Sequence, residues 1–260
     1  MPDPLREIFD EDAERYERAR PGYPDALFDD LFDLAGIGSG SRVLEIGCGT
    51  GQATVPLARR GCSVLAVELG ARLAAAAARN LAPYPNAQVV VGVFEDWPLP
   101  EEPFDAVVAF SAFHWVDADV GVAKVAAALR PDGSFARIDT DHVAGGTGPF
   151  FVDVQDCYER WDPDTPPGLR LSRADDVVYN ADPDPAGRFG AGQVRRYETD
   201  RAYTTAAYLD VLQTYSGHRA LDGDARDGLL ACIGSVIDER YGGLVVKRYL
   251  RTMRVSRRLS

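Results

Sequence analysis

The sequence predicts an α/β fold built on a mostly parallel sheet. Residues 41–68, SRVLEIGCGTGQATVPLARRGCSVLAVE, read as a buried strand, a glycine turn, a helix and a second strand. Further short apolar runs at 88–91, 104–110 and 134–138 alternate with helical segments. Strands that alternate with helices in this way are typical of a parallel sheet covered by helices.

The turn inside residues 41–68 suits a ligand. Gly47, Gly49 and Gly51 lack Cβ atoms, so the backbone can take positive φ and a ligand can lie against the main chain. The helix that follows, at 52–60, directs its open N–H groups toward this turn. Gln52 stands where the dinucleotide fingerprint G-x-G-x-x-G needs its third glycine, which argues against a nicotinamide-dependent reductase.

Carboxylates stand on both sides of these glycines. Glu45 lies in the first strand, and Glu68 ends the second strand 21 residues past Gly47. In nucleotide-binding βαβ units, an acid about 20 residues on meets ribose hydroxyls. With these acids, VLEIGCGTGQAT resembles the first motif of the class I S-adenosylmethionine (SAM) dependent methyltransferases. The resemblance implies SAM as cofactor and a doubly wound, Rossmann-like seven-stranded sheet of order 3-2-1-4-5-7-6 with its last strand antiparallel.

The N-terminal segment extends the resemblance. Tyr16, Arg20, Pro21 and Tyr23 are similar to the Y-x-x-A-R-P-x-Y-P segment of type 11 methyltransferases, among them relatives of trans-aconitate methyltransferase. The resemblance implies a helical segment over the cofactor, with Arg20 at the SAM carboxylate and Tyr16 and Tyr23 at the substrate. A solvated arginine and packing tyrosines are the alternatives.

Adenine recognition departs from the family pattern. By resemblance, Leu69 lies against the adenine, but Val93 stands where relatives usually carry an aspartate. Valine accepts no hydrogen bond, so we expect the backbone at Phe94 and the carboxylate of Glu95 or Asp96 to take over this role. A SAM-binding but catalytically silent protein is the alternative that this substitution favours.

The run 104–110 ends at SAFHW. Ligands of parallel sheets bind outside the carboxyl ends of the strands, so this stretch should face the cofactor. It resembles the H-W-[VF]-D segment of the family, which implies cofactor contact at Ser111 and substrate contact at Trp115. We expect His114 to act as a general base near pH 7, with a structural histidine as the alternative.

Residues 139–193 form an aromatic, proline-broken insertion, which predicts a substrate cap that includes His142. Strands are expected at 194–203 and 245–255, with helices at 208–217 and 225–241 between them. We therefore expect a single methyltransferase domain that comprises an N-terminal helical segment, a SAM-binding core, a cap, and the edge strands and helices (1–40, 41–138, 139–193 and 194–260).

Composition limits the acceptor. Lys and Arg total 28 against 40 acids, a net charge of −12, which disfavours nucleic acid and anionic membranes. We therefore expect methyl transfer to an oxygen or nitrogen of a small molecule, with RNA methylation as a less favoured alternative. The sequence leaves the oligomeric state open. No run of about 18 apolar residues occurs, which predicts a cytoplasmic protein without a membrane span.

The four cysteines and the C-terminal cations carry two further expectations. The cysteines lie outside any C-x-x-C pattern and only three histidines occur, so we expect free thiols and no metal site. The basic C-terminal residues predict a solvated edge strand guarded by charge, with an anionic-substrate site as the alternative. These residues are Lys247, Arg248, Arg251, Arg254, Arg257 and Arg258.

Overall fold

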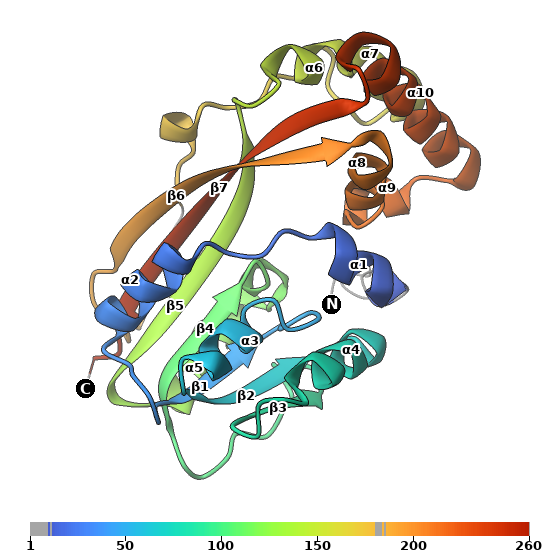
Figure 1. The fold of residues 1–260 in the computed structure, drawn as a ribbon. Helices are drawn as coiled ribbons and strands as arrows, with labels where there is room; N and C mark the ends of the chain where they lie inside the picture. Colours follow the sequence, from blue (N-terminus) through green and yellow to red (C-terminus); the bar gives the residue numbers. More distant parts are fainter. Residues whose placement is uncertain (1–9, 11, 180–183, 185, 260) are drawn as a thin grey trace.

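Seven strands form one sheet in the order β3-β2-β1-β4-β5-β7-β6, which confirms the predicted topology (Figure 1). The computed structural model describes residues 10, 12–179, 184 and 186–259. The strands are β1 (Arg42–Ile46), β2 (Ser63–Glu68), β3 (Ala87–Val91), β4 (Phe104–Phe110), β5 (Leu129–Val143), β6 (Gln193–Thr204) and β7 (Leu244–Arg257). Strands β1 to β5 run parallel, and β7 pairs antiparallel with both β5 and β6.

Helices cover both faces of the sheet. Val43 and Val108 pack toward α2 and α3, whereas the adjacent residues Leu44 and Val107 pack toward Val125 of α5. This alternation follows from the two-residue repeat of a strand. The helices are α1 (Ala13–Ala19), α2 (Asp25–Ala35), α3 (Thr54–Arg59), α4 (Ala71–Leu81), α5 (Ala118–Ala128), α6 (Gly148–Asp153), α7 (Gln155–Trp161), α8 (Thr205–Leu212), α9 (Ser216–Ala220) and α10 (Gly223–Tyr241).

Three long strands carry a second layer of structure away from the sheet core. β5, β6 and β7 have 15, 12 and 14 residues, against five to seven in the other strands. Figure 1 shows their far ends rising to helices α6 to α10. These helices enclose an apolar core of their own around Phe150, Tyr208, Leu229 and Ile233. The site described below lies between this core and the parallel strands.

The segments after β4 differ in detail from the sequence-based expectations. β5 continues to Val143, so the first residues of the predicted cap are strand, and the cap contains α6 and α7. The helix expected at 208–217 is two helices, because the backbone becomes extended at Tyr215. Asp132 has a φ of 60°, a left-handed conformation that residues other than glycine rarely adopt.

The expectation of four free thiols is wrong for Cys157 and Cys232. These residues form a disulfide between α7 and α10, with Cα atoms 5.7 Å apart. Their separation of 75 residues gave no local signal, and only the packing of α7 against α10 brings them together. Cys48 and Cys62 are free and buried.

None of the described helices is long and apolar enough to cross a bilayer.

Candidate functional site

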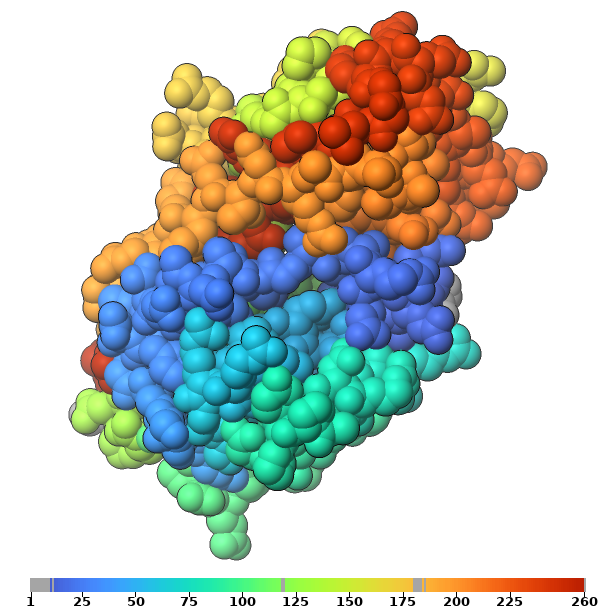
Figure 2. Space-filling view, viewed as in Figure 1, coloured from blue at the N-terminus to red at the C-terminus, as the bar shows by residue number. Residues whose placement is uncertain are grey.

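A cavity of about 600 Å³ opens at the carboxyl ends of β1, β2 and β4. Its other walls come from α1, α6, α7, the α8–α9 segment, β5 and β7. The chain order reverses between β2, β1 and β4, and ligands of open parallel sheets bind at such a point. In Figure 2 the N-terminal segment, in blue, lies along the boundary between the lower, cyan part and the upper, orange to red part. The volume fits a small-molecule site, for which about 300–1,000 Å³ is usual.

The glycine turn forms one end of the cavity. Gly47 and Gly49 have φ values of 68° and 57°, which favour glycine. A Cβ at Gly47 would lie 2.6 Å from the Cβ of Ala112, so the turn passes directly against the end of β4. Gly51 has a φ of 92° but lies outside the cavity lining and faces Ala77 of α4. Gly47 and Gly49 therefore face the cavity, and Gly51 serves the turn and helix packing.

The Glu68 carboxylate ties this turn to the end of β2. Its Oε2 accepts a hydrogen bond from the backbone N of Gly49 at 2.8 Å, and its Oε1 accepts one from Gly70 N at 2.9 Å. Burial raises the pKa of Glu68, and the two hydrogen bonds oppose that rise. Each carboxylate oxygen keeps a lone pair for another donor, such as a ribose hydroxyl.

Glu45 contributes a buried carboxyl group without a hydrogen-bond partner. Its side chain lines the cavity, is 1% exposed, and neither oxygen meets a donor. Burial raises the pKa of Glu45 to about 7; the nearby Thr54 hydroxyl, which does not reach hydrogen-bond geometry, opposes the rise, and the negative charge of Glu68 adds to it. An unsatisfied buried carboxyl group is costly, so Glu45 marks a position where a ligand donor would be stabilising.

Apolar residues form part of the wall beside β2. Leu69 and Phe94 line it, as the adenine assignment requires. Glu95 and Asp96 lie outside the lining. The Glu95 Oε1 instead accepts a hydrogen bond from Asp117 N at 3.1 Å, because the open N–H groups at the start of α5 attract a carboxylate. The structure therefore leaves Phe94, and not an acidic side chain, at the position expected to recognise adenine.

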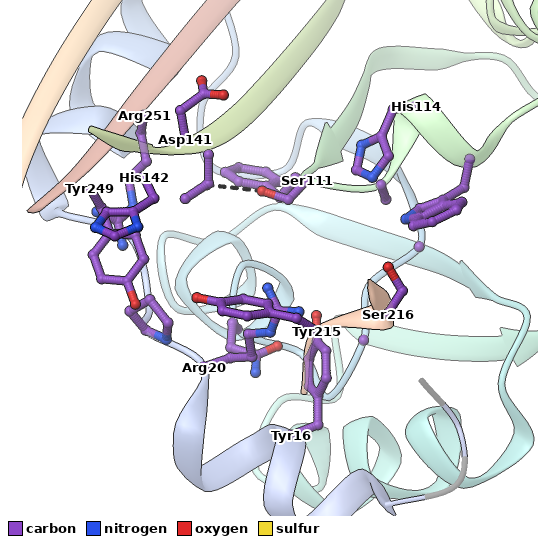
Figure 3. Close-up of a pocket in the computed structure, with 18 of the residues that line it drawn as sticks. Tyr16, Arg20, Ser111, His114, Asp141, His142, Tyr215, Ser216, Tyr249 and Arg251 are labelled. Atoms are coloured by element: carbon purple, nitrogen blue, oxygen red, sulfur yellow. Dashed lines mark hydrogen bonds between the residues drawn. The ribbon is translucent and has the colours of Figure 1, made fainter. Parts of the chain in front are cut away.

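Ser111 links three segments at the end of β4. Its φ is 53°, a conformation that non-glycine residues rarely adopt. The Ser111 hydroxyl donates to Thr140 Oγ1 at 2.9 Å, as drawn in Figure 3, and accepts from the Tyr23 hydroxyl at 3.4 Å. Ser111 and Tyr23 both line the cavity, so the N-terminal segment, β4 and β5 meet there.

His114 lies just beyond Ser111, in the short 3₁₀ helix Phe113–Trp115. Both His114 and Trp115 line the cavity, with their ring centres 4.9 Å apart. His114 is an exposed residue by solvent accessibility, but the protein around its imidazole desolvates it enough to lower its pKa below the ordinary 6.5. His114 is therefore neutral near pH 7, the form that accepts a proton. Figure 3 shows it across the cavity from His142.

Arg20 and Tyr16 come from the end of α1. The Arg20 Nη2 donates to Thr214 O at 2.7 Å, and the guanidinium lies 4.5 Å from the ring centre of Tyr215. The Nε of Arg20 is buried without a hydrogen-bond partner. The Tyr16 ring lies close to the glycine turn, since a Cβ at Gly49 would come within 3.2 Å of its Cε1. Both residues thus stand at the end of the cavity nearest that turn.

β7 supplies a row of cavity residues at positions where the sequence favoured a solvated edge strand over an anionic-substrate site. Lys247, Tyr249 and Arg251 alternate along the strand and line the cavity. The solvated edge strand expected here is wrong for them, because β7 lies between β5 and β6, and Lys247 and Arg251 are 3% and 2% exposed. The available signal was the spacing K-x-Y-x-R, which puts the three side chains on one face of a strand.

Two histidines complete this end of the cavity. His142 pairs with Tyr249 across β5 and β7, and its Nε2 has no hydrogen-bond partner. Burial, together with the charge of Lys247, lowers the pKa of His142 to about 2, so it is neutral. His218, which sequence reasoning also missed, shares a 2.9 Å hydrogen bond with the Tyr158 hydroxyl. Neither histidine belongs to a group of potential metal ligands among the described residues.

Comparisons with known proteins agree with this geometry. Residues 43–133 match a family described as a methyltransferase domain. A solved structure from Anaeromyxobacter dehalogenans, described as a candidate type II methyltransferase, covers 92% of this chain and 98% of its own, with 26% identity and a TM-score of 0.65. The chain contains a class I methyltransferase domain. The resemblance found in the sequence motifs is thereby confirmed at the level of that class.

Two further methyltransferases are similar to this chain. An uncharacterized methyltransferase of Mycobacterium tuberculosis is 37% identical over 123 residues, which are 47% of this chain and 48% of the relative. The chain thus spans about half the length of that curated relative. A phosphoethanolamine N-methyltransferase of Haemonchus contortus, solved with S-adenosylhomocysteine, shares the fold at 15% identity, with a TM-score of 0.55 and coverage of 99% and 61%.

Proposed function

We propose that this methyltransferase domain transfers the methyl group of SAM to an oxygen or nitrogen of a small-molecule acceptor. The observation that carries the proposal is the glycine turn with Glu68 hydrogen-bonded across it, at the end of the cavity. Such a turn accommodates a ligand against bare backbone, and the carboxylate can meet ribose hydroxyls.

The residues around the turn fit the parts of SAM. We assign the ribose to Glu68, the adenine to the wall of Leu69 and Phe94, and the SAM carboxylate to Arg20, whose Nε lacks a partner. The unpartnered carboxyl group of Glu45 fits a ligand donor at the floor of the cavity. Ser111 remains a candidate for cofactor contact through its position at the end of β4.

The chain's contribution to the reaction is positioning, exclusion of water and proton transfer. SAM held by these residues would supply an activated methyl group on positive sulfur, which an acceptor in line with the carbon–sulfur bond would displace. The cavity walls hold the acceptor in line and limit the access of water to the reacting groups. An acceptor oxygen or nitrogen that still carries a proton passes it to His114, which is neutral near pH 7.

Calorimetric titration with SAM tests this proposal. We expect wild-type protein to bind SAM with a Kd well below ~1 mM and not to bind NADH measurably. Gly49→Val should weaken SAM binding by more than about 100-fold, because φ of 57° strains a β-branched residue and the new side chain occupies the ligand's space. Gly223→Ala is the control, since a Cβ there meets nothing within 4 Å.

Two outcomes would contradict the proposal. One is the absence of SAM binding by folded wild-type protein. The other is equal SAM affinity of wild type and a folded Gly49→Val variant, which would place the ligand somewhere other than the glycine turn.

A further inference from the structure

The charged groups of Lys247 and Arg251 on β7 both lie close to the ring of Tyr249. The Lys247 Nζ lies 5.1 Å, and the Arg251 Cζ 5.2 Å, from the ring centre of Tyr249. Both cations are almost fully buried and line the cavity. Long side chains four residues apart on a strand thus bring two positive charges to a single place.

These two cations have no acidic partner among the described residues. The Lys247 Nζ donates one hydrogen bond, to the Tyr215 hydroxyl at 2.8 Å, and an ammonium group has three donors. Arg251 donates to the carbonyl of Gly22 and to the hydroxyl of Thr199, but its Nε is buried and unpartnered. Spare donors therefore remain on both side chains.

The neighbouring cation on the opposite face of β7 behaves differently. Arg248 is paired with Asp200, through bonds of 2.7 Å from Nε and Nη2, and lies near Glu198. The strand therefore neutralises its outward-facing cation and leaves its inward-facing cations without counter-charges. Burying a charge that lacks a partner is strongly unfavourable, so a counter-charge from outside the chain would relieve this cost.

The positive charges at this place affect the pKa of a neighbouring tyrosine, Tyr215. Burial alone would raise the pKa of Tyr215, yet the charges of Lys247 and Arg20 bring it below its ordinary value. Figure 3 shows the Tyr215 ring beside Arg20 and Tyr16, on the side of the cavity below Tyr249 and Arg251. Arg20 is thus near the glycine turn, where it would pair with the carboxylate of SAM. Lys247 and Arg251 are then available to bind a second ligand.

We propose that the acceptor carries an oxyanion, a carboxylate or a phosphate, that binds Lys247 and Arg251 over Tyr249, and that the rest of the acceptor is apolar or aromatic. The proposal rests on the methyltransferase function proposed above. The oxyanion serves as an anchor, because two hydrogen-bonded cations reduce its nucleophilicity. The apolar part follows from the apolar and aromatic side chains of the remaining lining, which include Phe151, Tyr158, Leu169, Leu171, Tyr208 and Leu212.

Calorimetric titration of protein saturated with S-adenosylhomocysteine tests the anchor. The probes share one frame: phenylacetate, phenyl phosphate and the neutral phenylacetamide. We expect at least one of the two anions to bind ten-fold or more tightly than the amide, and the tighter anion identifies the oxyanion. Lys247→Met should remove this preference while S-adenosylhomocysteine affinity stays within two-fold. Arg248→Gln, on the other face of the same strand, should retain it.

Thermal unfolding of the ligand-free variant provides a second readout. Lys247→Met should melt at or above the wild-type Tm, because it removes a buried charge that has no acidic partner. A decrease of more than about 5 °C would identify Lys247 as a structural residue and would contradict the anchor role.

The remaining outcomes separate this inference from the proposed function. If S-adenosylhomocysteine binds but the amide binds as well as both anions, or Lys247→Met keeps the preference, the oxyanion anchor is wrong and methyl transfer stands. If neither SAM nor S-adenosylhomocysteine binds, the proposed function is wrong, and the proposed oxyanion anchor is wrong as well.

Discussion

At the scale of single residues, two glutamates at the ends of neighbouring strands have opposite surroundings. Glu68 receives two backbone hydrogen bonds, whereas both oxygens of Glu45 lack a partner. The sequence could locate both acids, because each has a fixed place relative to the glycines. It could not distinguish a bonded carboxylate from an unbonded one, since the difference depends on how the turn closes over them.

The Glu45 carboxyl group should make the stability of the ligand-free protein depend on pH. Burial raises its pKa from 4.5 to about 7, so the folded state binds more protons than the unfolded state between these values. Stability therefore falls as the pH rises through this window, by at most about 3 kcal/mol. Glu45→Gln should remove this loss, and urea unfolding at pH 5 and pH 8 measures it. The difference in the free energy of unfolding between Glu45→Gln and the wild type should be larger at pH 8 than at pH 5. An equal or smaller difference at pH 8 would contradict this account.

His114 is the residue whose removal should affect turnover without affecting SAM binding. With an acceptor that has a proton to lose, His114→Ala should lower kcat by about 100-fold or more, a usual contribution of a general base. In the wild type, kcat/KM should be level near pH 7 and fall in acid, below the lowered pKa of His114. The variant should lose this acid limb. Normal turnover in the variant would assign His114 a structural role.

At the scale of elements, the main departures from expectation lie in α7 to α10 and β7. The single helix predicted at 208–217 is interrupted where the carbonyl oxygen of Thr214 accepts a hydrogen bond from Arg20, 194 residues away in the chain. This break turns Tyr215 toward the cavity. Helical periodicity does not register such a contact, because its partner belongs to another element.

The Cys157–Cys232 disulfide should stabilise the packing of α7 against α10. Replacing both cysteines with alanine should lower the free energy of unfolding by about 2–4 kcal/mol, because the link constrains a long loop of the unfolded chain. Thiol titration of the denatured, unreduced wild type should find two thiols, those of Cys48 and Cys62, and four after reduction. Four reactive thiols before reduction would show that the bond is absent.

At the scale of the whole molecule, strand order was predictable and the upper part was not. Residues 41–68 and the three apolar runs after them contain the five parallel strands, because buried strands of parallel sheets are rich in apolar residues, and the family resemblance implied their order. The long strands β5, β6 and β7 mix charged and apolar residues, so their length and their role in the cavity were hidden. Lys247 and Arg251 illustrate this limit, because the residue type alone does not distinguish a buried cation from a cation at the surface.

The most direct test of the account is a structure of the protein with S-adenosylhomocysteine bound. We expect the ribose hydroxyls within hydrogen-bond distance of Glu68, the amino-acid end at Gly47, Gly49 and Arg20, and the sulfur facing the space between His114 and the row on β7. A ligand bound elsewhere, or a Glu68 carboxylate without contact to the ribose, would contradict the assignment of the glycine turn as the SAM site.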